Sequence, residues 1–258
     1  MALFNGNTTI YKGGSVLTYQ AVFQRYEIKY LITQAQKDLI LRGIEPYMVL
    51  DEYGRTTIRN IYFDTMDYRL IRRSIERPVF KEKLRIRSYD RATPESTVFV
   101  ELKRKYRDTV YKRRLPLCEE QAMQWTQGLC PCEADTQISR EIDYFLSYYG
   151  TLRPTVFLSY EREAHRSLNG DSFRVTFDDT ILCRETGLSL GAGVYGTPLL
   201  EDGLVLMEIK CAGGIPLWMT GILSKEHIYK TSFSKYGAAY QKMIWPGPKT
   251  NKECAVYA

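Results

Sequence analysis

The sequence predicts an α+β fold in which about eight strands form a barrel, with helices packed on the outside. Three observations support this prediction. Most strand-like segments carry Lys or Arg at every second position, their opposite faces are apolar, and helical segments lie between them. Because successive side chains of a strand point to opposite faces, helices that cover the apolar side would leave the charged side facing inward, around a tunnel.

Composition limits the class of protein. The chain has 258 residues, 44% hydrophobic and 26% charged, with a net charge of +6. These values are typical of a soluble globular protein with one large domain or two small ones. The basic excess suits nucleic acid, an anionic membrane surface or a polyanionic small substrate. The cysteines form no regular framework, and neither a signal peptide nor an apolar run of about 18 residues occurs. We therefore expect a cytoplasmic chain without a transmembrane segment.

The first third of the chain predicts two strands and two helices. Residues 1–20 and 246–258 show no sustained period, so we expect flexible termini around a domain of residues 21–245. A strand is predicted over 22–31. Thr33 follows as an N-cap with Gln36 as its capping-box partner, and the apolar spacing predicts a helix over 33–45. Residues 56–64 are predicted to form a strand and residues 65–74 a short helix.

The next three strands carry the strongest charge pattern. One face of residues 81–89 holds Lys81, Lys83, Arg85 and Arg87. In residues 98–105, Glu101, Lys103 and Lys105 share a face that is opposite apolar residues. Residues 109–117 form a hairpin with this second strand and are basic on both faces. Of the two possible faces, we favour the one with Lys112 and Arg114, rather than Arg113, as the continuation of the cationic surface.

The second half alternates helices and strands. Helices are predicted over 119–128 and 136–149, the latter capped by Thr136, and a loop over 186–203. Strands are predicted over 155–162, 173–178, 180–184 and 204–210. Two further helices are expected over 216–226 and 232–244. In the strand over 173–178, Arg174, Thr176 and Asp178 share one face.

Single acidic residues accompany the cations on several strands, as in Glu27 with Lys29 and Glu208 with Lys210. A solvated outer face explains any one such strand, but not their repetition. A cationic interior is costly unless water and anions fill it, so the pattern favours a hydrated tunnel that holds a polyanion. Nucleic acid is disfavoured, because stacking aromatics do not line the basic strands.

Seven short motifs in order resemble the VTC domain, the polyphosphate polymerase module of the vacuolar transporter chaperone complex, in a form similar to its stand-alone bacterial relatives. The motifs are Glu27-Ile28-Lys29-Tyr30, Ile61-Tyr62-Phe63-Asp64, Lys83-Leu84-Arg85-Ile86-Arg87, Glu101-Leu102-Lys103, Tyr160-Glu161-Arg162, Glu208-Ile209-Lys210 and Phe233-Ser234-Lys235-Tyr236. The resemblance extends from about Phe23 to Met243. It implies the triphosphate tunnel metalloenzyme fold, an eight-stranded antiparallel barrel with the C-terminal helix at its tunnel.

The resemblance also implies a reaction, the transfer of the γ-phosphoryl group of ATP to a growing polyphosphate chain. The catalytic residues implied are Lys29, Arg85, Arg87, Lys103, Arg162 and Lys235. Further phosphate-binding residues would be Lys83, Lys112, Arg114, Tyr160, Arg174 and Ser234. Glu208 looks like the ligand of the required Mn²⁺ or Mg²⁺, and Glu27 and Glu101 would either add to that metal site or hold neighbouring lysines.

Other functions are compatible with the same residues. The tunnel suits a tripolyphosphatase or nucleoside triphosphatase equally well, and a polyphosphate-binding module without catalysis. The expected partners are ATP and polyphosphate, with a membrane protein as a further partner in the family. One departure from the family pattern is that Lys230 precedes Thr231-Ser232-Phe233, and is thus displaced from the usual lysine position. Metal preference, primer requirement, product length and oligomeric state do not follow from the sequence.

Overall fold

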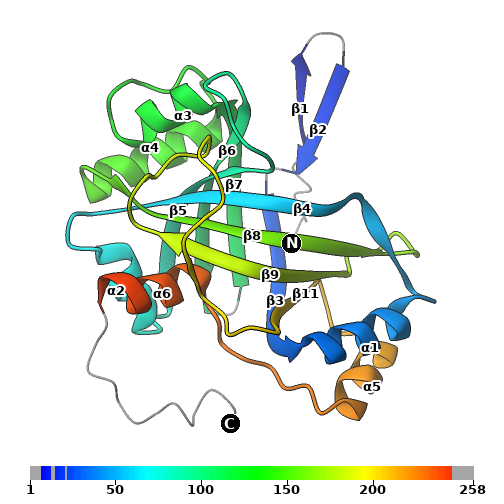
Figure 1. Cartoon of the computed structure of the whole chain (residues 1–258). Coiled ribbons are helices and arrows are strands. Elements are labelled where there is room, and N and C mark those ends of the chain that lie inside the picture. The colour runs from blue at the N-terminus through cyan, green and yellow to red at the C-terminus, as the bar shows by residue number, and fades with distance from the viewer. Residues whose placement is uncertain (1–6, 13–14, 21, 108, 246–258) are drawn as a thin grey trace. The chain divides into compact units, whose positions relative to one another are not determined.

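The computed structural model describes residues 7–12, 15–20, 22–107 and 109–245 (Figure 1). For residues up to 25 only the backbone is described. The chain divides into two units. The first contains Met1–Arg25, Tyr62–Ser88 and Ala92–Thr155, and the second Tyr26–Ile61, Tyr89–Arg91 and Val156–Ala258. Each unit is described separately below.

The main element is a nine-stranded sheet of order β10-β9-β11-β3-β7-β6-β5-β4-β8, in which β8 also pairs with β9. Its strands are β3 (Val22–Thr33), β4 (Met48–Asp64), β5 (Phe80–Ser88), β6 (Thr97–Tyr106), β7 (Thr109–Cys118), β8 (Arg153–Ser167), β9 (Arg174–Arg184), β10 (Thr197–Pro198) and β11 (Leu204–Cys211). The strand pairs on which the site depends are antiparallel. The prediction of an α+β fold dominated by antiparallel strands is therefore confirmed.

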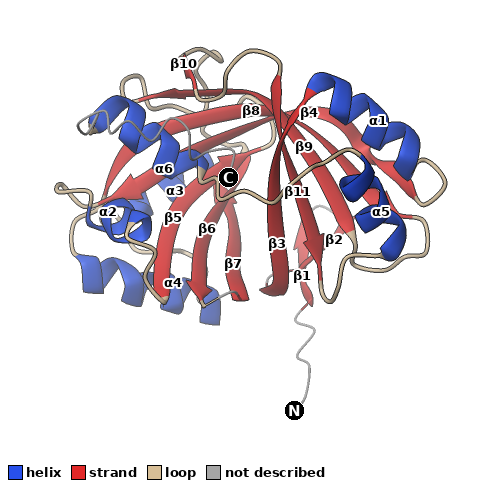
Figure 2. Ribbon diagram, turned by 90° about the horizontal axis from the view of Figure 1, so that it is seen from below, coloured by secondary structure: helices blue, strands red, loops and turns tan. Residues whose placement is uncertain are grey.

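In the first unit, β5, β6 and β7 form a continuous meander covered by helices on one face (Figure 2). The helices α3 (Glu119–Thr126) and α4 (Gln137–Tyr149) contact β6 and β7, and α2 (Arg69–Ile75) contacts β5. Completely buried residues on the covered face include Leu84, Ile86, Val98, Val100 and Leu102. The alternating cations Lys83, Arg85 and Lys103 therefore occupy the face opposite the helices, as their spacing requires.

Helix α2 begins four residues later than the sequence predicts, because two side chains hold the preceding turn. Asp64 Oδ1 accepts hydrogen bonds from the backbone N–H groups of Thr65 and Leu70, and Oδ2 accepts one from Ile71. The hydroxyl of Thr65 accepts the N–H of Arg69. These side chains satisfy donors that a helix start leaves without partners.

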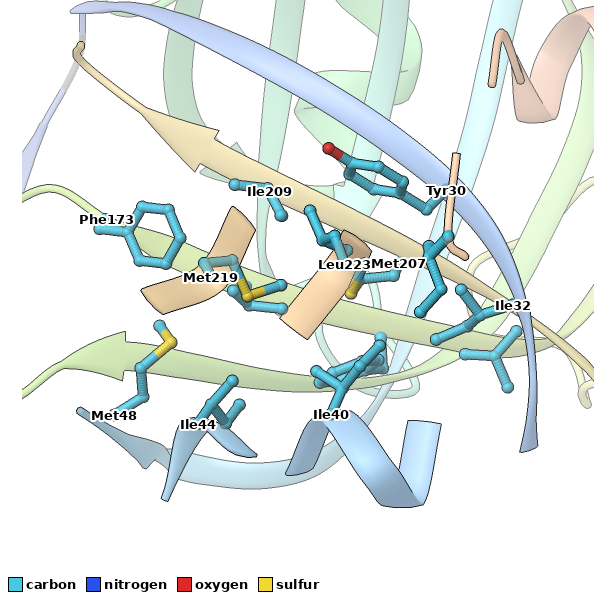
Figure 3. Close-up of a cluster of buried hydrophobic side chains, with 14 of the residues drawn as sticks. Tyr30, Ile32, Ile40, Ile44, Met48, Phe173, Met207, Ile209, Met219 and Leu223 are labelled. Atoms are coloured by element: carbon cyan, nitrogen blue, oxygen red, sulfur yellow. The ribbon is translucent and has the colours of Figure 1, made fainter. Parts of the chain in front are cut away.

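The second unit contains a hydrophobic core between its strands and two helices (Figure 3). The helices are α1 (Gln34–Ile44) and α5 (Leu217–Lys225), which lie side by side in Figures 1 and 2. The strands contribute Ile32, Val175, Phe177, Met207 and Ile209, all nearly or completely buried. In β9 and β11 these residues alternate with Thr176, Asp178 and Glu208, so the core fixes which face carries the charges.

Two local features place α1. The Thr33 hydroxyl accepts the N–H of Gln36, whose side chain accepts the N–H of Thr33, and this confirms the predicted capping box. At the other end of the helix, Gly43 faces α5. A Cβ at this position would lie 2.8 Å from Cδ1 of Ile222, so the absence of a side chain permits the close approach of the helices.

A bulge interrupts the pairing of β8 with β9. Ser159 lies opposite Leu182, whereas Glu161 lies opposite Asp179. Between these two pairs the chain moves two positions along β8 but three along β9, so β9 holds one extra residue. Thr180, in this interval, has a φ of 47°, in the left-handed region that an extra bulge residue can adopt. Beyond the bulge, Arg162 is paired with Asp178.

Some elements differ from the sequence prediction. Strands β1 (Asn7–Lys12) and β2 (Ser15–Gln20) pair with each other where no regular element was predicted. Strand β4 is longer than predicted, and the predicted C-terminal helix is divided into α6 (Lys235–Ala239) and a π-helical turn over Tyr240–Ile244. The five described cysteines are free thiols. Among the described residues, no helix has the length and apolarity needed to cross a membrane.

Candidate functional site

The first unit contains a carboxylate surrounded by cations, which we call the Glu101 cluster: Glu101, Arg85, Arg87, Lys112 and Arg114. Glu101 is completely buried. One oxygen accepts from Nη2 of Arg85 at 2.7 Å and from Nε at 2.9 Å, with Nε of Arg87 at 4.0 Å. The other oxygen accepts from Nζ of Lys112 at 3.1 Å and from Arg114 at 2.6 to 2.7 Å. Both oxygens are thus fully used.

Strand register assembles this cluster. Arg85 of β5 lies directly opposite Glu101 of β6, which in turn lies opposite Arg114 of β7. Arg113 points to the other face, where its Nε donates to Glu141 of α4 at 2.8 Å. The predicted choice of Lys112 with Arg114 is therefore confirmed.

The same face carries rows of lysines across the three strands. Lys83 of β5 lies opposite Lys103 of β6, which lies opposite Lys112 of β7. Lys81 lies opposite Lys105 one row further along. Like charges placed directly opposite one another destabilise a sheet, so these rows indicate a surface that functions with anions.

The pKa values in this cluster reflect burial and charge together. Burial alone would raise the pKa of Glu101, but Lys112, Arg87, Arg85 and Arg114 outweigh it and hold that pKa well below the usual range. Burial lowers the pKa of Lys112 strongly; Glu101 opposes this shift and the neighbouring guanidinium groups add to it. Burial, together with Lys105, Arg77 and Lys103, also lowers the pKa of Lys81. A bound anion would favour the charged form of both lysines.

The second unit contains the Asp178 cluster, formed by Asp178, Arg162, Lys235 and Tyr160. Asp178 is completely buried and accepts both Nε and Nη2 of Arg162, each at 2.6 Å. Its Oδ2 also accepts Nζ of Lys235 of α6 at 2.6 Å. The ring of Tyr160 lies against both cations, with its centroid 4.5 Å from Nζ of Lys235 and 5.1 Å from Cζ of Arg162.

Glu208 of β11 lies beside this cluster but is bound more loosely. Its carboxylate oxygens lie 3.4 to 3.8 Å from the charged nitrogens of Lys29, Lys210, Lys235 and Arg162. These distances exceed those of ordinary hydrogen bonds. Burial would raise the pKa of Glu208, but Lys235, Lys210, Lys29 and Arg162 lower it well below the usual range. Glu208 is thus an ionised carboxylate whose oxygens are not held by short contacts.

The surroundings of Glu208 suit a divalent cation whose remaining ligands do not come from the protein. Among the described residues, no three His, Cys, Asp or Glu side chains form a metal-binding group. Thr176 lies opposite Glu208, and its buried hydroxyl has no hydrogen-bond partner among the residues that the structure describes. Mg²⁺ and Mn²⁺ often use one or two carboxylates and take the remaining ligands from phosphate and water. Glu208, with this hydroxyl nearby, could therefore hold such a metal.

The remaining predicted residues lie around these groups. Nζ of Lys29 donates to the carbonyl of Phe233 at 2.5 Å. Glu27 lies opposite Lys210, one row from Glu208. Arg174 donates from Nη2 to Asp51 at 2.7 Å and is not paired with Asp178. Ser234 caps α6 by accepting the N–H of Gly237. Glu101 holds cations, the second of the two roles expected for it.

Sequence analysis missed three members of the site. Asp178 was placed on the correct face of its strand but given no role. Tyr62, whose hydroxyl accepts Nη1 of Arg85 at 3.0 Å, was assigned no role in the site. Lys210 was considered only as a partner of Glu208. For Asp178 the available signal was its spacing of four from Arg174, which puts both on one strand face.

Each cluster thus presents more cations than carboxylates. Glu101 is surrounded by Arg85, Arg87, Lys112 and Arg114, and Asp178 together with the adjoining Glu208 is surrounded by Lys29, Arg162, Lys210 and Lys235. Arg and Lys at such density are suited to phosphate groups, which accept bidentate and point-charge contacts. The sequence matches the VTC domain over residues 24–244.

The chain belongs to the VTC domain family. The resemblance stated from the motifs is therefore confirmed. No curated protein matches the sequence.

Solved structures share the fold of this VTC domain at low sequence identity. A protein of Hippeastrum assigned as an adenylyl cyclase, and described as having a dominant triphosphatase activity, is 18% identical, with a TM-score of 0.54 over 84% of this chain and 96% of that one. A protein of Bacillus halodurans assigned as an adenylate cyclase is 16% identical, with a TM-score of 0.53 over 86% of this chain and 98% of that one. The VTC domain thus shares its fold with these two proteins.

Proposed function

We propose that this VTC domain is an ATP-dependent polyphosphate polymerase. The terminal oxygen of a polyphosphate chain attacks the γ-phosphorus of ATP, the bond to the β,γ-bridging oxygen breaks, and ADP leaves. The observation that carries the proposal is the density of Arg and Lys around few carboxylates in both units, within a chain of this family. Such a transfer requires mainly that phosphates be positioned and their charge neutralised.

In this proposal, the cations of both units bind phosphate groups. Arg85, Arg87 and Lys103 hold phosphates on the face of the first unit, and Lys29, Arg162 and Lys235 do so in the second. No side chain needs to act as a covalent nucleophile. Glu208 would hold a Mn²⁺ or Mg²⁺ ion, which would offset the negative charge of the phosphates.

The proposal includes the closed barrel of the family. It is supported by the strand order, in which β8 pairs with both β4 and β9. The cationic faces would then line a tunnel, with α6 at the tunnel. A cytoplasmic location and a membrane-protein partner that takes up the product are further parts of the proposal.

The second candidate is a tripolyphosphatase or nucleoside triphosphatase. It is favoured by the Hippeastrum protein, which has the same fold and is described as having a dominant triphosphatase activity. Water would replace the polyphosphate end as the attacking group, while the phosphate-binding residues stay the same. The third candidate, a polyphosphate-binding module without catalysis, needs the cations but not the metal site at Glu208.

One experiment separates these functions. Purified protein is incubated with ATP and Mn²⁺, and long polyphosphate and free phosphate are both measured. Long chains that disappear in Arg85→Ala/Arg87→Ala support the polymerase. Arg104→Ala is the matched control, because Arg104 lies on the other face of the same sheet and donates to Glu82 at 2.7 Å. Phosphate release without chains would establish the triphosphatase, and polyphosphate binding without turnover would establish the binding module.

A further inference from the structure

Asp178 differs from Glu208 in how its oxygens are used. Three N–H donors at 2.6 Å reach its two oxygens, from Nε and Nη2 of Arg162 and from Nζ of Lys235. Among the described residues, the charged nitrogens that surround Glu208 lie 3.4 Å or more from its oxygens. About three of the four lone-pair positions of the Asp178 carboxylate are thus used, and a metal ion would compete there with two buried cations at hydrogen-bonding distance.

The contacts of Asp178 fix two cations from different elements. Arg162 is on β8 and Lys235 on α6, and both lie against the ring of Tyr160. A guanidinium group has five N–H donors and an ammonium group three. Asp178 uses two of the former and one of the latter. The other donors keep a fixed direction, because the bidentate pair sets the plane of the guanidinium group.

We propose that Asp178 is a positioning residue, which orients Arg162 and Lys235 before a phosphate group arrives and does not itself bind metal. This inference rests on the proposed function in taking phosphate as the ligand. The change in anion binding that this role predicts on removal of Asp178 is opposite to the change expected from charge alone. Removing a negative charge from a cationic site should strengthen anion binding by Coulomb's law, whereas loss of orientation should weaken it.

Asp179 provides a matched control in the next position of the chain. It lies on the opposite strand face, where it binds Arg55 through both carboxylate oxygens, at 2.5 and 2.9 Å. Lys37 lies 4.0 Å from it. The substitutions Asp178→Asn and Asp179→Asn therefore each remove one carboxylate bound bidentately to an arginine, in the same strand. Only the first concerns the proposed phosphate site.

The test is calorimetric titration of both variants with tripolyphosphate without metal, followed by Mn²⁺ titration of turnover. We expect Asp178→Asn to weaken tripolyphosphate binding about tenfold or more, as expected for lost charge-assisted contacts. The Mn²⁺ concentration for half-maximal turnover should be unchanged, and Asp178→Glu should recover part of the binding. Asp179→Asn should match the wild type in both measurements. Unchanged or tighter tripolyphosphate binding by Asp178→Asn, or a shift in its Mn²⁺ requirement alone, would overturn the inference.

A measurement on the unmodified protein covers the case in which Asp178→Asn does not fold. In the absence of ligand, the Arg162 Nε–H signal in a nitrogen-15 NMR spectrum should exchange slowly with water and stay unchanged when tripolyphosphate is added. A signal that becomes protected only with tripolyphosphate would refute prior orientation by Asp178. If the wild type neither binds nor turns over phosphates, the proposed function fails, while this spectrum still shows whether Asp178 holds Arg162.

Discussion

Replacing Glu101 by glutamine tests whether one buried carboxylate holds the cationic face of β5, β6 and β7 together. Glu101 is completely buried and accepts hydrogen bonds from Arg85, Lys112 and Arg114. The amide keeps the shape of the side chain but leaves these cations facing one another without a counter-charge. Removing one partner of a buried ion pair typically costs about 3–5 kcal/mol. We expect Glu101→Gln to lose that much free energy of unfolding.

The measurement is urea unfolding at neutral pH, followed by circular dichroism and tryptophan fluorescence. Glu141→Gln is the control, since Glu141 also lies between two arginines, Arg104 and Arg113, on the other face of the same strands. Its side chain is 22% exposed, so its loss should cost no more than about 1 kcal/mol. The reasoning is refuted if Glu101→Gln loses no more stability than Glu141→Gln.

The same pair of proteins gives a pH dependence with a definite sign. The pKa of Glu101 in the folded state lies well below its ordinary value of 4.5. The stabilisation by its ionised form is therefore complete above that value and is lost as the pH falls through the lowered pKa. The wild-type advantage over Glu101→Gln should be constant near neutral pH and decrease only in acid. An advantage that already declined between pH 8 and 6 would contradict this origin.

Three further predictions concern separate elements. Asp64→Ala leaves the N–H groups at the start of α2 without acceptors and should cost about 3 kcal/mol in thermal unfolding; an unchanged melting temperature would contradict it. Gly43→Val should cost about 1–3 kcal/mol because it crowds Ile222, and Ile222→Ala should restore part of the loss; additive losses would argue against crowding. Glu208→Gln should raise the Mn²⁺ concentration for half-maximal turnover about tenfold or more without weakening metal-free tripolyphosphate binding. Weaker metal-free binding would show that Glu208 orients the cations instead.

Local chemistry explains what the sequence could predict. Thr33 and Gln36 are three residues apart, so their capping box depends on no distant contact. The alternation of β5 places Arg85 and Arg87 on one face wherever the strand lies. Whether Lys112 or Arg113 shares a face with the cations of β6 is harder to predict, because both faces of β7 are basic. The β6–β7 hairpin decides it, since its register places Lys112 opposite Lys103.

Distant contacts explain what the sequence did not predict. Asp178 acquires its role from Arg162 of β8 and Lys235 of α6, and no short motif contains all three. Tyr62 meets Arg85 across separate strands. The first half of β4 shows no alternation, because its burial varies irregularly along the strand. Such residues acquire their roles only when the strand order is known.

The bulge between β8 and β9 has a consequence for how such a site can change in evolution. The pairing before the bulge, continued without interruption, would bring Arg162 opposite Asp179 rather than Asp178. Deleting Thr180, the residue with positive φ in the bulge, would remove the extra residue of β9, and Glu161 and Arg162 would stay opposite Asp179 and Asp178 in a regular ladder. Straightening the bulge while Thr180 stays in the ladder would instead place Asp179 opposite Arg162 and turn Asp178 to the other strand face. The adjacent aspartates mean that such a one-residue slip still offers Arg162 a carboxylate, whereas a deletion at Thr180 preserves the present pair.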